Sequence, residues 1–350
     1  MEKEEPEAKP VASTASGAGL FASHSATFSS AAPAQPQPAD TVWQRVVYGN
    51  EDGVLQMIQT TPRLVEERTT VVDYSGRTVD NATPFQMALR AGDEIMAKKI
   101  KAIYLQYDHD NGQTLLDAQF NEVFPLGYAA HLQEQKVSAD TFERDHLNPL
   151  VEAISNASPA DLQAALDKRD NGSALVQALN AFKAAFADLS LREKVFNPNH
   201  LLKAFEKYDA KFDAWYVNGD NPCRWLRLDL FWRQVTGWEE RYMTANYAQS
   251  FCTGLSNIVD GGQPLRRTLI LYNCDTNRDI NFFPLDAERS SRLGAEFACE
   301  VWGANGVARG CGTLRRVAAF TKLMSSKNSK LGGIMQPESN RRAAPGCLVQ

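Results

Sequence analysis

The chain has 350 residues, of which 43% are hydrophobic, and this is enough to build sizeable cores in two or three domains. No run of 18 apolar residues occurs, so no transmembrane helix is expected. The net charge of the chain is −5, and the part before Arg315 carries a net charge of −11, which argues against general nucleic-acid binding. Met1–Pro10 is charged and lacks the apolar stretch of a secretory signal peptide, and Glu2 stands where N-myristoylation requires glycine.

Residues 1–39 are rich in Ala, Ser, Pro, Glu and Gly and carry only three large apolar side chains. A segment of this kind buries too little surface to offset the entropy of the chain. We therefore predict a disordered N-terminal arm over residues 1–39, with order beginning near Asp40.

Four short helices are predicted in the next segment. Val42–Asn50 is amphipathic and ends in Gly-Asn, which favours a left-handed helix end. Apolar residues over 54–58 indicate a second helix that stops before Pro62. After a polar stretch, residues 83–93 and then residues 95–103 again have helical periodicity.

The six residues that begin at Thr83 read Thr-Pro-Phe-Gln-Met-Ala, which resembles the ankyrin signature TPLHxA with Phe for Leu and Gln for His. In this pattern Thr83 caps a helix and Pro84 occupies its first position. Ala88 permits close packing, and Gly92 ends the helix. Gly49 and Gly92 are 43 positions apart, the size of an ankyrin unit with about ten inserted residues.

Three strings, Asp73–Thr78, Ile270–Asn273 and Leu293–Phe297, look like segments of a group of Legionella Dot/Icm-translocated effectors with degenerate ankyrin repeats. The resemblance extends loosely over residues 40–330. It implies a protein secreted into a host cell, where an ankyrin-like surface binds a host protein. Effectors of this group sometimes end in a CaaX box that the host modifies, and the resemblance implies no particular reaction.

Helical patterns continue over residues 138–217, and the segment 222–251 then interleaves tryptophans with arginines. Such a segment could form a surface that stacks on bases or flanks a phosphorylated headgroup. Helical spacing of its apolar residues instead favours a buried core stripe. The residues of this stripe are Trp225, Leu228, Trp232 and Val235.

Alternating apolar residues over 267–273, 280–285 and 293–303 predict two or three strands, followed by a helix over residues 314–324. The predicted fold class is therefore mainly α. The predicted domains are degenerate ankyrin-like helical repeats over residues 40–135, a helical domain over residues 136–325 with a small β-hairpin or three-stranded sheet near 265–303, and a basic flexible tail with a CaaX box over residues 326–350.

The last four residues, Cys347, Leu348, Val349 and Gln350, match a CaaX box, in which Gln favours farnesylation of the cysteine. One lipid chain binds a bilayer marginally, so stable anchoring needs a second signal such as a basic patch. From Arg315 onward seven cations and one acid give a net charge of +6, which leaves −11 for the rest of the chain. The cations expected to meet an anionic membrane are Arg315, Arg316, Lys322, Lys327, Lys330, Arg341 and Arg342.

These features together predict a prenyl-anchored adaptor that acts at a host membrane through an ankyrin-like surface. Its expected partners are a host protein, a host prenyltransferase and an anionic membrane, with no nucleic acid. It is expected to be a peripheral, lipid-anchored protein without a transmembrane helix.

An enzyme of unknown class in residues 138–325, with the ankyrin-like part selecting substrates, is the alternative function. The chain lacks the common phosphate-binding, dinucleotide, zinc-protease and nucleophile-elbow motifs, and we expect no cofactor and no metal. The five cysteines before Cys347 lack CxxC spacing and are expected to be reduced, buried thiols. A Cys-His-Asp site that combines Cys223 or Cys252 with His200 stays open, although an isolated histidine is more often a cap or surface residue.

Overall fold

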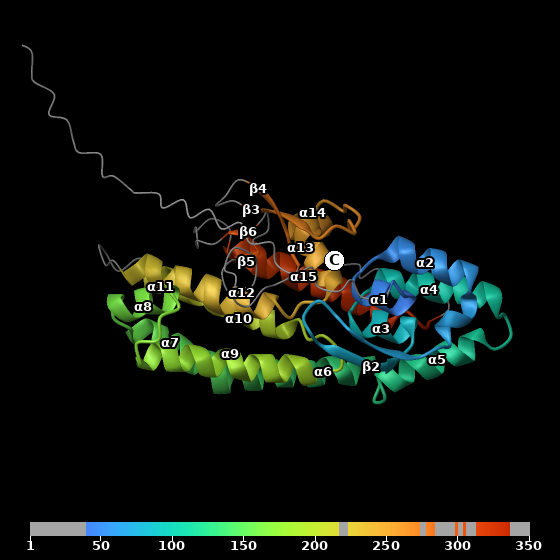
Figure 1. Cartoon of the computed structure of the whole chain (residues 1–350), viewed down its shortest axis with the longest axis horizontal. Coiled ribbons are helices and arrows are strands. Elements are labelled where there is room, and N and C mark those ends of the chain that lie inside the picture. The colour runs from blue at the N-terminus through green and yellow to red at the C-terminus, as the bar shows by residue number, and fades with distance from the viewer. Residues whose placement is uncertain are drawn as a thin grey trace, which may run out of the picture. The chain divides into compact units, whose positions relative to one another are not determined.

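The computed structural model describes residues 40–216, 223–273, 278–283, 298–299, 304–305 and 313–336. These residues belong to one compact unit, in which helices predominate and two small sheets are present (Figure 1). The prediction of a mainly α fold with a small sheet is confirmed. The predicted disordered arm, residues 1–39, lies outside the described residues.

The first part of the fold consists of two helical hairpins stacked on each other. α1 packs on α3 and α2 packs on α4, so the second hairpin repeats the arrangement of the first. An antiparallel pair of strands, β1 and β2, lies between the two hairpins in the chain. The bounds are α1 (Val42–Val47), α2 (Glu51–Thr60), η1 (Pro62–Val65), β1 (Thr69–Val72), β2 (Thr78–Ala82), α3 (Pro84–Arg90) and α4 (Glu94–Tyr107).

The start of α3 follows the predicted local chemistry. The hydroxyl of Thr83 accepts a hydrogen bond from the Gln86 backbone N–H at 3.2 Å, and the Gln86 side chain accepts one from the Thr83 N–H at 3.2 Å. Pro84 occupies the first turn, where no backbone donor is needed. Ala88 is fully buried, and Gly92 has a φ of +70° at the end of the helix. The sequence therefore predicted each of these local roles.

The polar stretch before Thr83 forms a hairpin that the sequence patterns did not indicate. Asp73 organises its turn, because its Oδ1 accepts hydrogen bonds from the backbone N–H of Ser75 and of Arg77 at 2.8 and 3.1 Å. Its Oδ2 pairs with the Arg77 guanidinium at 3.0 Å. Gly76 has a φ of +83°, which an L residue adopts only with strain.

The middle of the chain forms long helices that contain two π-helical segments, η2 and η3. Pro149 lies in the first turn after η2, where an ordinary α-helix would force its ring against a carbonyl four residues earlier. The wider π turn is one known way to accommodate such a break.

The helices after α4 have the following bounds: α5 (Gly112–Val123), α6 (Tyr128–Phe142), η2 (Glu143–Leu147), α7 (Asn148–Asn156), α8 (Pro159–Leu166), α9 (Ala174–Arg192), α10 (Asn199–Tyr216), α11 (Cys223–Phe231), η3 (Trp232–Thr236), α12 (Gly237–Glu240), α13 (Ala245–Thr253), α14 (Leu255–Val259) and α15 (Thr313–Gly332).

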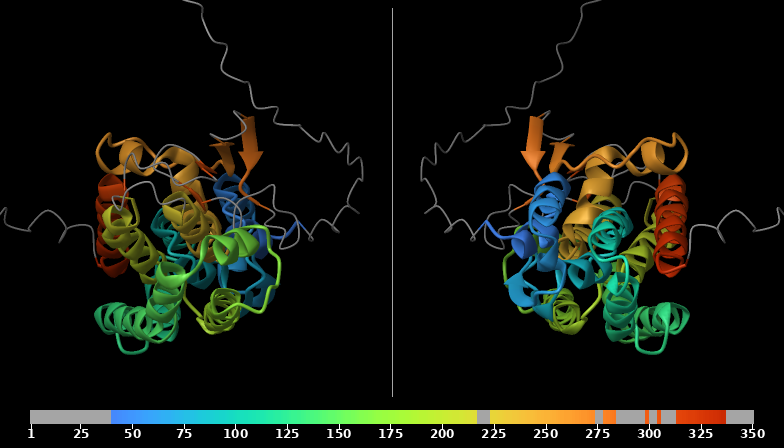
Figure 2. Two further views of the ribbon diagram at one scale, coloured as in Figure 1. Left: turned by 90° about the vertical axis from the view of Figure 1, so that its left-hand side faces the viewer. Right: turned by 90° about the vertical axis from the view of Figure 1, so that its right-hand side faces the viewer.

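The second sheet has the strand order β4-β3-β6-β5. β3 and β4 pair antiparallel over four residues, as expected for the first predicted pair, whereas β3 and β6 pair parallel. Figure 2 shows β3 and β4, in orange, at the edge of the helical body in both views. The bounds are β3 (Ile270–Asn273), β4 (Arg278–Asn281), β5 (Ala298–Cys299) and β6 (Ala304–Asn305).

Two of the predicted domain boundaries fall inside helices of the structure. The boundary between residues 135 and 136 cuts α6, and the tail predicted from residue 326 begins as α15, which continues to Gly332. α15 also joins the two hydrophobic clusters of the fold. Phe320 and Leu323 lie in the cluster of the later helices, whereas Leu331 and Ile334 lie in the cluster of α1–α4. Burial of these side chains keeps this part of the chain helical and packed.

Among the described helices, none has both the length and the apolar character required to cross a bilayer.

We predict that Gly92→Ala destabilises the fold more than Gly76→Ala does. Both glycines have positive φ, so each alanine costs about 1 kcal/mol in backbone strain. A Cβ on Gly92 would also lie 3.0 Å from the Tyr247 ring, whereas a Cβ on Gly76 would meet open space. We expect a total loss of about 2–3 kcal/mol for Gly92→Ala in urea unfolding at constant m-value. Equal losses for the two variants would contradict close packing at Gly92.

Candidate functional site: a lysine-lined groove between α4 and α15

The candidate site lies along the amphipathic helix α15. Its buried face carries Phe320, Leu323, Met324, Lys327 and Leu331, which follow the i, i+3, i+4, i+7 pattern of one helix face. Lys322, Ser326 and Lys330 follow one another at intervals of four and lie on the exposed side of the helix. One helix therefore supplies both the packing contacts and a row of polar side chains.

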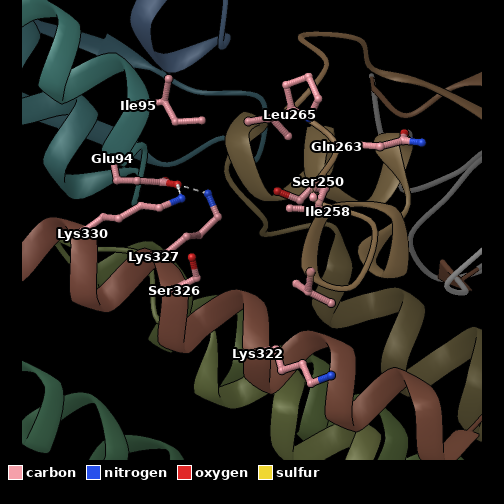
Figure 3. A pocket seen from close by; sticks show the side chains of 13 residues that line it. Glu94, Ile95, Ser250, Ile258, Gln263, Leu265, Lys322, Ser326, Lys327 and Lys330 are labelled. Atoms are coloured by element: carbon pink, nitrogen blue, oxygen red, sulfur yellow. Dashed lines mark hydrogen bonds and ion pairs between the residues drawn. The ribbon is translucent and has the colours of Figure 1, made fainter. Parts of the chain in front are cut away.

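A groove runs along this polar row (Figure 3). One hollow of about 490 Å³ lies between α15, the start of α4 and the chain from Ile258 to Leu265. A second hollow of about 480 Å³ continues between α4 and the end of α15. The two hollows share Glu94, Ile95 and Lys330, so they form one continuous surface, which we call the α4–α15 groove.

The floor of the groove contains a buried ion pair. Lys327 is 2% exposed, and its Nζ lies 2.9 Å from Oε2 of Glu94 and donates a second hydrogen bond to Asn246. Lys330 approaches the other oxygen of Glu94 at 3.5 Å but keeps its side chain 59% exposed. A buried charge is tolerated only when it is paired and hydrogen-bonded, so Lys327 and Glu94 fix each other and α15 against α4.

Arg267 makes a second set of ion pairs, with carboxylates at the N-termini of α4 and α2. Its guanidinium donates to Asp93 at 2.6 and 2.9 Å, to Gln249 at 2.9 Å and to Glu51 at 2.9 Å. Asp93 caps α4 and Glu51 begins α2, so one side chain joins the N-termini of both helices. Burial alone would lower the pKa of Arg267, but the charges and hydrogen bonds of Asp93 and Glu51 raise it above its ordinary value.

Two of the seven cations predicted to meet a membrane are buried, and that prediction is corrected for them. Lys327 is held by Glu94 as described above. Arg316 is 3% exposed, and its guanidinium lies 3.9 Å from the centre of the Trp232 ring and 3.8 Å from Asp209. The cation–π interaction with Trp232 and the charge of Asp209 stabilise the Arg316 guanidinium in the core. Arg316 belongs to the helix predicted over residues 314–324 and Lys327 to the predicted tail, and the structure places both on the buried face of α15.

The remaining predicted cations differ in position. Lys322 and Lys330 are exposed at the groove, each about 60% accessible. The side chain of Arg315, the residues Arg341 and Arg342, and the CaaX residues Cys347 to Gln350 lie outside the described residues.

The tryptophan-rich segment forms core, as the helical spacing favoured. Leu228, Trp232 and Val235 are fully buried, although Trp225 is 37% exposed. Directly after the π-helical segment η3 come two buried carboxyls, Glu239 and Glu240.

Burial raises the pKa of both carboxyls. For Glu239 the neighbouring charge of Glu240 raises it further, and its oxygens accept no hydrogen bond within the described part of the chain. For Glu240 the pKa rises to about 8, although two hydrogen bonds from the Cys299 N–H and the charge of Arg316 oppose the shift. The two carboxyls, Glu239 and Glu240, are therefore both neutral or carry a single negative charge between them within the core.

The candidate thiol Cys252 does not have the character of an activated nucleophile. Burial raises the pKa of Cys252 to about 12 and also raises that of Cys299, which is opposite to the change that activates a nucleophile. His200 is buried, not a surface or cap residue: its Nε2 lies 3.0 Å from Glu193, and its ring packs edge-on to Phe142 and Phe186. Among the described residues no cluster of three metal-ligating side chains occurs.

No protein-family model, curated protein or solved structure matches this chain. The assignment of a site therefore depends on the geometry described above.

Sequence reasoning found the lysines of α15 but missed the groove. Its other side comes from Ile95, Lys98 and Lys99 on α4, more than 220 residues earlier in the chain. The one available signal was the run of lysines on α4, which helical spacing alone would assign to an ordinary solvated face.

We predict that Arg267→Met costs about 3–5 kcal/mol, because it leaves the carboxylates of Glu51 and Asp93 buried without their shared cation. Lys99 pairs with the same Glu51 but is 49% exposed, so Lys99→Met should cost less than about 1 kcal/mol. Urea unfolding of both variants measures the difference. Similar, small losses in the free energy of unfolding for both variants would contradict a stabilising role of the Arg267 ion pairs.

We predict that the stability of the fold falls as the pH rises from about 4.5 to 8. The pKa of Glu240 is higher in the folded state than its ordinary value, so its protonated form favours folding and this contribution is lost as the pH passes about 8. Glu240→Gln should flatten the stability profile by up to about 1.4 kcal/mol per pH unit within this range. Glu152→Gln, at an exposed position on α7, is the control and should leave the slope unchanged. A profile that does not respond to Glu240→Gln would contradict a buried, neutral carboxyl.

Proposed function

We propose that the chain is a prenyl-anchored adaptor that holds a partner protein at a membrane. The observation that carries the proposal is the position of the α4–α15 groove, which continues to the end of α15 and is lined there by Lys330 and Ile334. Cys347 follows Gln336 by eleven residues, a stretch that spans at most about 40 Å. A lipid on Cys347 would keep the groove within that distance of a bilayer.

The chemistry proposed at Cys347 is thioether formation. Where Gln350 ends the mature chain, the sulfur of Cys347 loses its proton and displaces diphosphate from a prenyl diphosphate on a host prenyltransferase. One lipid chain gives only marginal binding, so a second contact is needed. Arg341 and Arg342, which lie six and five residues before Cys347 in the sequence, would supply it at about 1 kcal/mol each on an anionic leaflet.

The stacked hairpins α1–α2 and α3–α4 support an ankyrin-like origin for the first segment. The capping box at Thr83, the Pro84 in the first turn and the left-handed Gly92 are the local features of that repeat. On this basis the adaptor is proposed to act in a host cell, as implied by the resemblance to Legionella Dot/Icm effectors. The partner would be a host protein.

We predict that protein made in eukaryotic cells carries a C15 adduct on Cys347, and that Cys347→Ser moves the protein from the membrane fraction to the soluble fraction. Intact mass spectrometry and fractionation measure the two effects. Gln350→Leu is the matched control, because a terminal Leu favours a C20 adduct and should preserve membrane association. An unmodified Cys347, or membrane binding that survives Cys347→Ser, would refute the anchor.

A further inference from the structure

The shape of the α4–α15 groove fits an elongated ligand. It follows α15 from Lys322 to the end of the helix at Gly332, a distance of about 15 Å at 1.5 Å per residue. This length corresponds to about three turns of a docked helix. The opposite walls are α4 and the chain that follows α14, so the groove is bounded by packed elements.

The lining of the groove has an apolar centre and cationic ends. Ile95 and Leu265 face each other across it, with Ile258 below them (Figure 3). Lys322 lies at one end, and Lys330 lies two helical turns away, about 12 Å along α15. The exposed Lys98 and Lys99 extend the positive charge beyond Lys330.

The separation of the charges favours a peptide over a single phosphate group. A compact anion requires donors that converge on one point, whereas these lysines are spread along the helix. Exposed charge pairs add little affinity but set the orientation of a partner, and the apolar centre would supply the affinity.

We propose that the α4–α15 groove binds an amphipathic helix of a partner protein, with two acidic residues seven or eight positions apart and apolar residues between them. The acids pair with Lys322 and Lys330, and the apolar side chains contact Ile95 and Leu265. This arrangement is the helix-in-groove mode, in which anchors recur at intervals of three or four residues. The inference rests on the proposed adaptor function and names the chemistry of its partner.

The test is selection of a displayed library of random 16-residue peptides on the full, unprenylated chain. We expect enriched sequences with paired acids around an apolar centre, which bind in fluorescence anisotropy. The double variant Lys322→Glu/Lys330→Glu should weaken these peptides at least tenfold and should instead select peptides with basic residues at the same two positions. Ile95→Asp should also abolish binding, whereas Arg169→Glu, in the turn after α8, should leave it unchanged.

Enrichment of no peptide, or of peptides that bind the double variant equally well, would overturn the proposal. Vesicles with 30% phosphatidylserine provide a second arm. Vesicle binding that depends on Lys322 and Lys330, without peptide enrichment, would assign the groove to a lipid surface and would equally overturn a helix ligand. Neither arm uses Cys347, so failure here leaves the prenyl anchor intact, and failure of the anchor leaves the groove intact.

Discussion

Buried ion pairs at the N-termini of α2 and α4 hold the two halves of the chain together. Glu51, Asp93 and Glu94 lie where the helix dipoles favour negative charge. Their cations come from distant segments: Arg267 precedes β3, and Lys327 belongs to α15. Because an unpaired charge in these positions would be costly, the ion pairs fix how the later helices dock on the first two hairpins.

This docking explains how two repeat-like hairpins are stable without further repeats. A solenoid usually needs three or more units, since each unit buries its apolar face on the next. Here α13 takes part of that role. The turn at Gly49 lies against Gln249, whose side chain donates to the Gly49 carbonyl at 2.9 Å, and the turn at Gly92 lies against Tyr247. The ends of the hairpins are therefore occupied within the chain and are not free for a partner.

Part of the surface between α4 and α15 stays accessible, and this is the α4–α15 groove. α15 has two structural roles there, because its apolar residues enter both cores while Lys322 and Lys330 line the groove. Its packed face fixes the row of lysines in space. A groove built on two packed helices keeps its shape without a ligand, which lowers the cost of ordering on binding.

The sequence by itself determined the local elements. Thr83, Pro84 and Gly92 specify the start and end of a helix through short-range hydrogen bonds and backbone preferences. The period of 3.6 residues in the apolar positions predicts α9 and α10 as helices with one buried face. It also gave the mainly helical class. The sequence patterns did not predict the hairpin around Asp73, because its strands are short and polar.

Only the tertiary structure decided which charges are buried and which surfaces meet. Lys322, Lys327 and Lys330 look alike in the sequence, yet Lys327 is enclosed with Glu94 while the other two stay exposed. The difference depends on the rotation of α15 against α4, across more than 220 residues of chain. Local propensity carries no information about that rotation, because long-range packing of apolar side chains and pairing of buried charges set it.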